Sequence, residues 1–278
     1  MLVTLKEILK IAEERNIAIG AFNAPNMPTV RAVIGAAEEL NQPVIIMHIP
    51  IHEEMGLCKM EEMAPLMLTF AKNAKVPVCV HLDHGSDVNE VLKGIELGFT
   101  SVMYDGSNLT TEKNIVNTKI VVEAARKTGC SVEAEIGSMG AREGTGEKAK
   151  SIYTDPVIAT YFVNQTGIDA LACAFGTAHG FYKDVPKLDF ELLSAIKYYV
   201  DIPIVMHGGS GVSENDYREV IKRGVRKINY YTYMSKEGAA AVANKEYTQF
   251  HDIVADAEKA MKENAKKAIK IFSNIKEN

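Results

Sequence analysis

The chain of 278 residues alternates between short apolar segments and longer amphipathic segments from one end to the other. The short segments are continuously apolar and rich in β-branched residues, which is typical of strands buried on both faces of a parallel sheet. They predict strands near residues 18–23, 43–48, 77–83, 100–104, 131–136, 169–173, 203–207 and 226–229. Helical periodicity between them predicts helices near residues 28–41, 60–74, 87–97, 110–128, 155–166, 189–199 and 213–223.

Two more helices flank this alternation. Thr4 and Glu7 have the spacing of a capping box and predict a helix before the first strand, and a long segment with an apolar stripe that includes Phe272 and Ile275 predicts a C-terminal helix. Eight parallel strands covered by helices fit a closed barrel, which commonly forms one domain of about 250 residues. We therefore predict an α/β fold, a single-domain (β/α)₈ TIM barrel over residues 1–278 with both extra helices. A doubly wound open sheet is the alternative.

Composition excludes several classes of partner. The 31 basic and 36 acidic residues give a net charge of −5, so no overall positive field attracts nucleic acid or an anionic membrane. There is no apolar run of membrane-spanning length and no signal-peptide pattern at the N-terminus. The four cysteines (Cys58, Cys79, Cys130 and Cys173) are widely separated and lack CxxC spacing, which fits a reducing compartment. We expect a cytoplasmic protein.

Histidines follow three of the predicted strands. His84, His179 and His207 come at or just after the carboxyl ends of strands, where the active site of a barrel is built. One such histidine alone is more often a structural residue, but three that meet at one rim predict a catalytic divalent-metal site with one open position. His81 lies three residues before His84 and cannot share its orientation within a strand, so we predict a supporting role for His81.

A glycine-rich turn follows the seventh predicted strand. The sequence HGGSG at 207–211 offers backbone N–H groups for a phosphate at the position where barrel enzymes often bind one. Asn229 and Thr232, at the end of the eighth strand, add side-chain donors. A tight turn that requires a positive φ is the alternative role of these glycines.

The loop after the fifth predicted strand, residues 137–151, is long and glycine-rich around Arg142 and Glu143. Loops of this kind at barrel mouths commonly act as lids, and a carboxylate on a lid serves as a base only when substrate is bound. We predict this role for Glu143, with a solvated loop charge as the alternative.

Five motifs together resemble one known family. They are HLDHGS at 81–86, VEAEIG at 132–137, GTAHGFYK at 176–183, HGGSG at 207–211 and KIN at 227–229. In this order they are similar to the class II, metal-dependent fructose-bisphosphate and tagatose-bisphosphate aldolases, and the resemblance covers nearly the whole chain.

The resemblance implies a metal centre. His84, His179 and His207 would bind Zn²⁺, or another divalent metal, and Glu135 would bind metal in a second, inner position. The metal would polarise the carbonyl of a ketose and promote its aldol cleavage. A buried charge-pairing role is the alternative for Glu135.

It also implies the remaining catalytic and binding roles. Asp83 would handle the hydroxyl proton of the aldehyde half, and Glu143 would exchange the carbon-bound proton of dihydroxyacetone phosphate. The family pattern places the substrate against Asn23, Gly180, Lys183, Gly208, Gly209, Ser210, Asn229 and Thr232. Backbone carbonyls nearby would hold a monovalent cation. The implied partner is a sugar phosphate of carbohydrate metabolism such as glycolysis, and the implied assembly is a homodimer or homotetramer.

The chain departs from the family pattern where the far end of the sugar would lie. Tyr231 stands where relatives have a small polar or acidic residue, with Tyr230 and Tyr233 beside it, and His48 and His52 lie where many relatives have a serine-containing turn. We expect these side chains to present apolar surface and neutral hydrogen-bonding groups to the second half of the substrate. The basic segment that anchors a second phosphate is missing, and residues 247–251 take its place. We therefore predict that a monophosphate is preferred, with a fructose-1,6-bisphosphate or tagatose-1,6-bisphosphate aldolase as the alternative.

Two other functions remain open on the sequence. A metal-dependent hydrolase would use a metal-activated water, but that reaction gives no role to the glycine-rich turn at 207–211 or to Glu143. A relative that binds a sugar phosphate without turnover would not need Asp83 and Glu143 beside three histidines.

Overall fold

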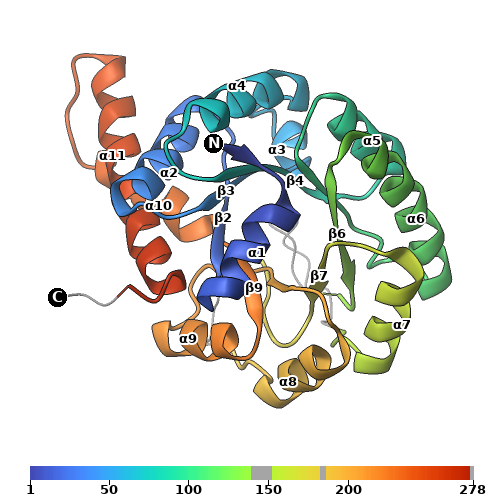
Figure 1. Cartoon of the computed structure of the whole chain (residues 1–278). Coiled ribbons are helices and arrows are strands. Elements are labelled where there is room, and N and C mark those ends of the chain that lie inside the picture. Colours follow the sequence, from blue (N-terminus) through green and yellow to red (C-terminus); the bar gives the residue numbers. More distant parts are fainter. Residues whose placement is uncertain (139–151, 182–185, 276–278) are drawn as a thin grey trace.

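The computed structural model describes residues 1–138, 152–181 and 186–275 (Figure 1). Within these ranges, eight parallel strands form a closed ring in the order β4, β3, β2, β9, β8, β7, β6 and β5, and β5 pairs with β4. Their bounds are β2 (Ile19–Asn23), β3 (Val44–His48), β4 (Val78–Gly85), β5 (Ser101–Tyr104), β6 (Ser131–Ile136), β7 (Ala170–Cys173), β8 (Ile204–Met206) and β9 (Val225–Asn229). The closed ring confirms the predicted barrel and excludes the open sheet.

Helices surround the ring (Figure 1). They are α2 (Met27–Leu40), α4 (Met60–Asn73), α5 (Val88–Glu96), α6 (Thr111–Thr128), α7 (Pro156–Thr166), α8 (Phe190–Tyr199), α9 (Glu214–Lys222), α10 (Thr232–Val242) and α11 (Phe250–Phe272). Several begin at side chains that accept hydrogen bonds from the first-turn amides, as Asp87 does for α5 and Ser213 for α9. Among the described residues, no helix is both long and apolar enough to cross a membrane.

The helix α1 (Leu5–Arg15) lies across one end of the barrel (Figure 1). Its predicted capping box is present, because the Thr4 side chain accepts from the Glu7 amide at 3.2 Å and Glu7 Oε2 accepts from the Thr4 amide at 2.8 Å. The apolar face of α1 packs on inward-facing strand residues. The buried cluster formed in this way is Leu5, Ile8, Leu9, Ala12, Ile17, Ile19, Ala21, Ile45, Met47, Cys79, Met103, Ala170, Ala172 and Val205.

The interior changes character along each strand. On β4, Cys79 belongs to the apolar cluster below, whereas His81 and Asp83, at the next two alternate positions, are buried and polar. On β9, Lys227 and Asn229 follow the same alternation. The half of the barrel away from α1 therefore carries a layer of polar side chains toward the carboxyl ends of the strands.

The structure contains three short or irregular elements that we did not predict. The strand β1 (Leu2–Val3) pairs with β4, and α3 (Ile51–Glu54) follows β3; both are too short to give a periodic pattern. The helix α10 buries Thr232, Met234 and Gly238, and Gly238 lets it approach α11, since a Cβ at this position would lie 2.8 Å from Cγ of Met261.

The C-terminal helix α11 packs on α2 and α10. The predicted stripe is confirmed where Ala268 and Phe272 are buried, while Ile275 lies beyond the end of the helix. An ion pair between Arg31 and Glu258, at 3.2 Å, also links α2 with α11.

Candidate metal centre and substrate pocket

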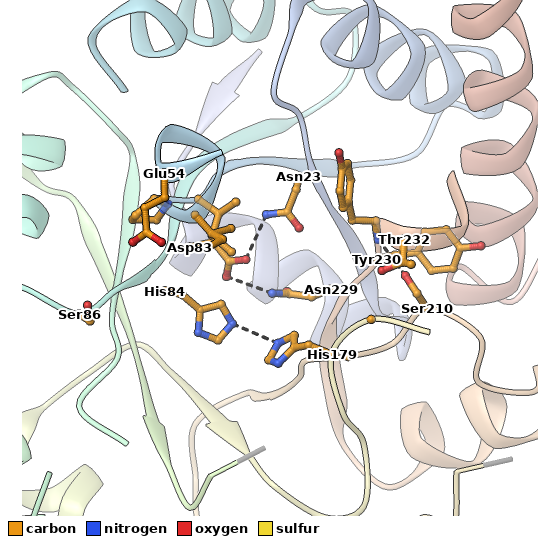
Figure 2. A pocket seen from close by; sticks show the side chains of 16 residues that line it. Asn23, Glu54, Asp83, His84, Ser86, His179, Ser210, Asn229, Tyr230 and Thr232 are labelled. Carbon is orange, nitrogen blue, oxygen red and sulfur yellow. Dashed lines mark hydrogen bonds between the residues drawn. The ribbon is translucent and has the colours of Figure 1, made fainter. Parts of the chain in front are cut away.

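The three predicted histidines meet at the carboxyl ends of the strands. Nε2 of His84 lies 2.7 Å from Nδ1 of His207 and 3.2 Å from Nε2 of His179 (Figure 2 shows the pair of His84 and His179). His84 comes from β4, His207 follows β8, and His179 lies in the connection after β7. The structure therefore brings together the three histidines that the sequence placed at the ends of three different strands.

The backbone at His84 explains why it can face the site together with its neighbour Asp83. Successive side chains of a regular strand point to opposite faces. His84 has a φ of 50°, and the pairing of β4 with β5 is irregular between Leu82 and Gly85. This local turn brings the side chains of Asp83 and His84 to the same pocket. His81 stays below them, with Nδ1 2.8 Å from Oγ of Ser101.

The histidine cluster fits a divalent metal. Burial and the neighbouring imidazoles lower the pKa of His179 to about 3, and burial and His84 lower the pKa of His207, so both rings are neutral. Burial opposes the charge on His84, but Asp83 and Asp105 raise its pKa to about 9. One ligand atom from each histidine lies within 4.8 Å of the others. Such a set of imidazoles, partly open to a pocket, suits catalytic zinc.

A second group of possible ligands adjoins the first. Asp105, Glu135 and His84 each offer a ligand atom within the same 4.8 Å limit. Oε2 of Glu135 lies 4.0 Å from Nδ1 of His84, and Glu135 is buried and absent from the pocket lining. This position is compatible with the inner metal position that the resemblance implies for Glu135.

Two buried carboxylates that we did not predict stand behind the histidines. Asp105 Oδ2 lies 2.9 Å from Nδ1 of His84, and Glu133 Oε1 lies 2.7 Å from Nε2 of His207. Asp105 directly follows β5, so its place at a strand end was a usable signal. Glu133 lies two residues before Glu135 on β6 and shares its face, which was also readable from the sequence.

Asp83 is held as an ionised acceptor. Its Oδ2 accepts from Nδ2 of Asn23 at 3.2 Å and its Oδ1 accepts from Nδ2 of Asn229 at 3.0 Å (Figure 2). Burial alone would raise the pKa of Asp83, but the positive charges of His84 and Lys227 hold it well below the usual range.

One half of the pocket is lined by the residues that we predicted to bind phosphate. Gly180, Gly208, Ser210, Asn229 and Thr232 all line it. Gly208 has a φ of 62°, and a Cβ there would lie 2.3 Å from the carbonyl oxygen of Ala178, so this approach requires glycine. The other two glycines of the turn, Gly209 and Gly211, are not part of the lining.

The amide of Gly209 is already used, since its N–H donates to the carbonyl of Asn229 at 3.0 Å. The structure therefore brings every predicted substrate residue it describes to the pocket except Gly209. Glu143 and Lys183 lie outside the described residues.

The other half of the pocket has a different chemistry. Ile49, Pro50 and Ile51 supply apolar surface, and Glu54 and Ser86 complete it. In Figure 2, Glu54 and Ser86 lie on one side of Asp83 and the histidines, and Ser210 and Thr232 lie on the other. The short helix α3, which the sequence did not reveal, supplies Ile51 and Glu54.

Acidic residues gather around this half. Glu90 on α5 is half-buried, and burial together with the charges of Glu53, Asp87 and Glu54 raises its pKa to about 6. Among the described residues that line the pocket there is no lysine or arginine. The charged side chain that the described residues contribute to this half of the lining is therefore the carboxylate of Glu54.

Our expectation for the histidines and tyrosines at this end needs correction. His48 and His52 are buried below the pocket surface and do not line it, because His48 turns toward Glu53 and His52 packs on the ring of Tyr231. Tyr230 lines the pocket beside Thr232, at the end away from Glu54 (Figure 2).

Tyr233 is not part of the described lining. It packs against Phe181, with 5.7 Å between the ring centroids. Tyr231 lines the pocket as well as Tyr230, so two of the three expected tyrosines reach it, and Ile49, Pro50 and Ile51 add apolar surface that we did not predict.

Comparison with known proteins agrees with this geometry. The family model for class II fructose-bisphosphate aldolase matches residues 3–277. The chain is 37% identical to a fructose-bisphosphate aldolase of Staphylococcus aureus, over 98% of this chain and 97% of the relative. Its fold is similar to the YdjI aldolase of Escherichia coli K12, with 34% identity, a TM-score of 0.88, and coverage of 98% and 97% of the two chains. A putative fructose-1,6-bisphosphate aldolase of Coccidioides immitis has 26% identity and a TM-score of 0.89, with coverage of 96% and 95%.

Proposed function

The chain belongs to the class II fructose-bisphosphate aldolase family, and we propose that it cleaves a ketose 1-phosphate reversibly into dihydroxyacetone phosphate and an uncharged aldehyde. The observation that carries this proposal is the position of Asp83, His84 and His179 between two unlike halves of one pocket, with His207 directly against His84. His84, His179 and His207 would hold the metal, for which zinc is our choice. A bound divalent metal supplies a Lewis acid that draws electron density from the ketose carbonyl.

Asp83 provides the base for bond cleavage. Its carboxylate accepts the proton of the hydroxyl on C4 of the ketose; that carbon becomes the aldehyde carbonyl as the C3–C4 bond breaks. The electron pair of the broken bond passes to the dihydroxyacetone phosphate half, whose carbon then takes up a proton. Hydrogen bonds from Asn23 and Asn229 fix both oxygens of Asp83 and keep the carboxylate ready to accept. Glu143 is the proposed source of the carbon-bound proton.

The glycine-rich half binds the phosphate of the dihydroxyacetone phosphate portion. Gly180 and Gly208 allow close approach of the backbone, and Ser210, Asn229 and Thr232 place polar side chains on the same wall. Exposed amides on such a turn suit an anion without requiring a lysine.

The half that contains Glu54 receives the aldehyde portion. A second phosphate there would be a dianion beside a carboxylate, and a charge that loses water without gaining a partner is penalised by several kcal/mol. An uncharged polyhydroxy chain meets apolar contacts from Ile49 and Ile51 and hydrogen-bonding groups from Glu54 and Ser86 instead. We therefore infer that a ketose 1-phosphate is preferred over the 1,6-bisphosphates.

A substrate panel tests this function. We expect fructose 1-phosphate or tagatose 1-phosphate to yield dihydroxyacetone phosphate, with activity lost on treatment with a chelator and restored by Zn²⁺. A preference of tenfold or more in kcat/KM for a bisphosphate, about 1.4 kcal/mol in transition-state binding, would identify a bisphosphate aldolase instead. Release of inorganic phosphate without dihydroxyacetone phosphate would indicate a hydrolase, and binding without turnover would contradict both.

A further inference from the structure

A buried lysine and a buried glutamate lie directly beneath the histidine cluster. Nζ of Lys227, on β9, lies 2.9 Å from Oε2 and 3.1 Å from Oε1 of Glu133, on β6. Both side chains have no solvent exposure. A buried ion pair usually adds little stability over well-packed apolar residues, since both charges lose their water. Stability alone therefore does not account for this pair.

Glu133 also fixes the orientation of a metal-site histidine. Its Oε1 lies 2.7 Å from Nε2 of His207. A carboxylate paired with a lysine only accepts, so Nε2 of His207 must carry the hydrogen. Nδ1 of His207 is then unprotonated in the neutral ring, and it is the atom that faces His84 at 2.7 Å. The glutamate thus selects the tautomer that a metal at the histidine cluster requires.

Lys227 completes this arrangement by balancing the charge of Glu133. A carboxylate without a counterion would draw the shared proton of His207 toward itself and increase the negative character of the ring. Nζ of Lys227 lies within 3.1 Å of both carboxylate oxygens of Glu133 and neutralises their charge. His207 therefore stays a neutral imidazole whose Nδ1 can bind the metal. His81 is the next group that faces the glutamate, with Nε2 3.8 Å from Oε2, and burial lowers its pKa to about 3.

We propose that Lys227 and Glu133 are positioning residues for the metal centre, which act through His207 by setting its tautomer and its strength as a ligand. This inference rests on the metal site of the proposed function. Neither residue lines the substrate pocket. Their effect is therefore expected on metal binding itself, and not only on turnover.

Metal binding in a charge-balanced variant tests the proposal. In Glu133→Leu/Lys227→Met the acceptor for Nε2 of His207 and its counterion are removed together, so the change leaves no new unpaired charge in the barrel. We expect Zn²⁺ affinity, measured by competition with a chromogenic chelator, to fall by about 10- to 100-fold, as is typical when the partner of a metal-binding histidine is removed. The visible absorption of the Co²⁺-substituted protein should shift as well. Wild-type Zn²⁺ affinity and Co²⁺ spectrum in this folded variant would overturn the proposal.

The neighbouring residue on β9 offers a matched control. Arg226 is also buried, and its Nε lies 2.7 Å from Oε2 of Glu13 on α1, far from the histidines. The variant Glu13→Gln/Arg226→Met removes a similar ion pair and should lower the melting temperature while leaving Zn²⁺ affinity within twofold. An equal loss of Zn²⁺ affinity in the control would show a general effect of destabilisation and would also overturn the proposal.

Two further variants separate the partners and guard against misfolding. Glu133→Asp retains the charge but withdraws the carboxylate from His207, so it should weaken Zn²⁺ binding even if the double variant fails to fold. Lys227→Met should shift the Co²⁺ spectrum, and an unchanged spectrum would remove Lys227 from the proposal. If the wild-type protein binds neither Zn²⁺ nor Co²⁺, the proposed function fails; if it binds them and the variants match it, only this inference fails.

Discussion

Nδ2 of Asn229 lies 3.0 Å from Oδ1 of Asp83 and connects the ends of β9 and β4 across the mouth of the barrel. Because an amide nitrogen can only donate, this contact requires an oxygen that accepts, and the low pKa of Asp83 satisfies the requirement. The contact also holds the carboxylate next to the histidines, where the proposed proton transfer takes place.

Asp83 and Glu143 should separate the two proton transfers. We expect Asp83→Ala to abolish carbon–carbon cleavage, with a loss of at least about 100-fold in kcat, while sparing some exchange of the carbon-bound proton of dihydroxyacetone phosphate. Glu143→Ala should abolish that exchange. Release of tritium from labelled dihydroxyacetone phosphate measures the exchange, and equal loss of both activities in both variants would contradict separate roles.

His179 is the ligand whose removal should disturb its surroundings least, since it lies in a loop and is partly exposed, whereas His84 belongs to β4 and His207 is fully buried. We expect His179→Ala to lose most of its bound metal and more than about 99% of its activity while keeping the melting temperature of the metal-free wild type. Metal analysis after gel filtration and thermal unfolding check this. Full activity in wild-type protein stripped of metal would contradict the assignment.

Zinc affinity should depend on pH through His84. Its pKa of about 9 in the metal-free protein means that the ring is protonated at neutral pH, and a metal must displace that proton. Affinity should therefore fall about tenfold for each pH unit below 9. Titration calorimetry in buffers of different ionisation enthalpy should detect the released proton at pH 7.5, and no release there would contradict the prediction.

The charge at Glu54 should set the preference for the aldehyde half. We expect Glu54→Lys to increase the ratio of kcat/KM for fructose 1,6-bisphosphate to that for fructose 1-phosphate by about tenfold, because the variant removes a repulsive charge and adds an attractive one. Glu96→Lys makes the same change in charge at an exposed position of α5 that does not line the pocket. A similar change in the ratio for both variants would assign the effect to net charge.

Glu90 should make stability depend on pH. Its pKa is about 6 in the folded protein and 4.5 for an ordinary glutamate, so the folded state holds more protons between these values and loses stability as the pH rises through them. Glu90→Gln should therefore raise the melting temperature at pH 7.5 by about 1–3 °C. The difference should vanish below pH 4.5. An equal difference at both pH values would rule out this titration as the cause.

The barrel could be predicted because each long element carries its own pattern. The run from Val78 to Leu82 is apolar enough to indicate a buried strand without its neighbours, and Thr4 with Glu7 indicates the start of α1. The elements that escaped prediction depend on contacts with the rest of the fold. Leu2 and Val3 form a strand only because Val78 and Cys79 offer a free edge, and α10 is held by its contact with α11.

The part of the site that could be predicted consists of residues that lie at strand ends within recognisable motifs. His84, His179 and His207 were found in this way. The supporting pair of Glu133 and Lys227 was missed because an alternating polar residue within a strand has no visible partner until β6 and β9 face one another across the barrel. The missed Glu54 depends on a helix of four residues.

The buried apolar cluster formed by α1 and the inward-facing strand residues next to it closes the end of the barrel away from the histidines. Because the described residues close that end, the two halves of a sugar cleaved by the proposed reaction would both leave through the opening at the carboxyl ends of the strands. A high concentration of either product then retards the forward reaction by reoccupying that route. If the proposed function holds, the same confinement would favour synthesis, since an aldehyde that enters while dihydroxyacetone phosphate is bound would meet it in the same pocket.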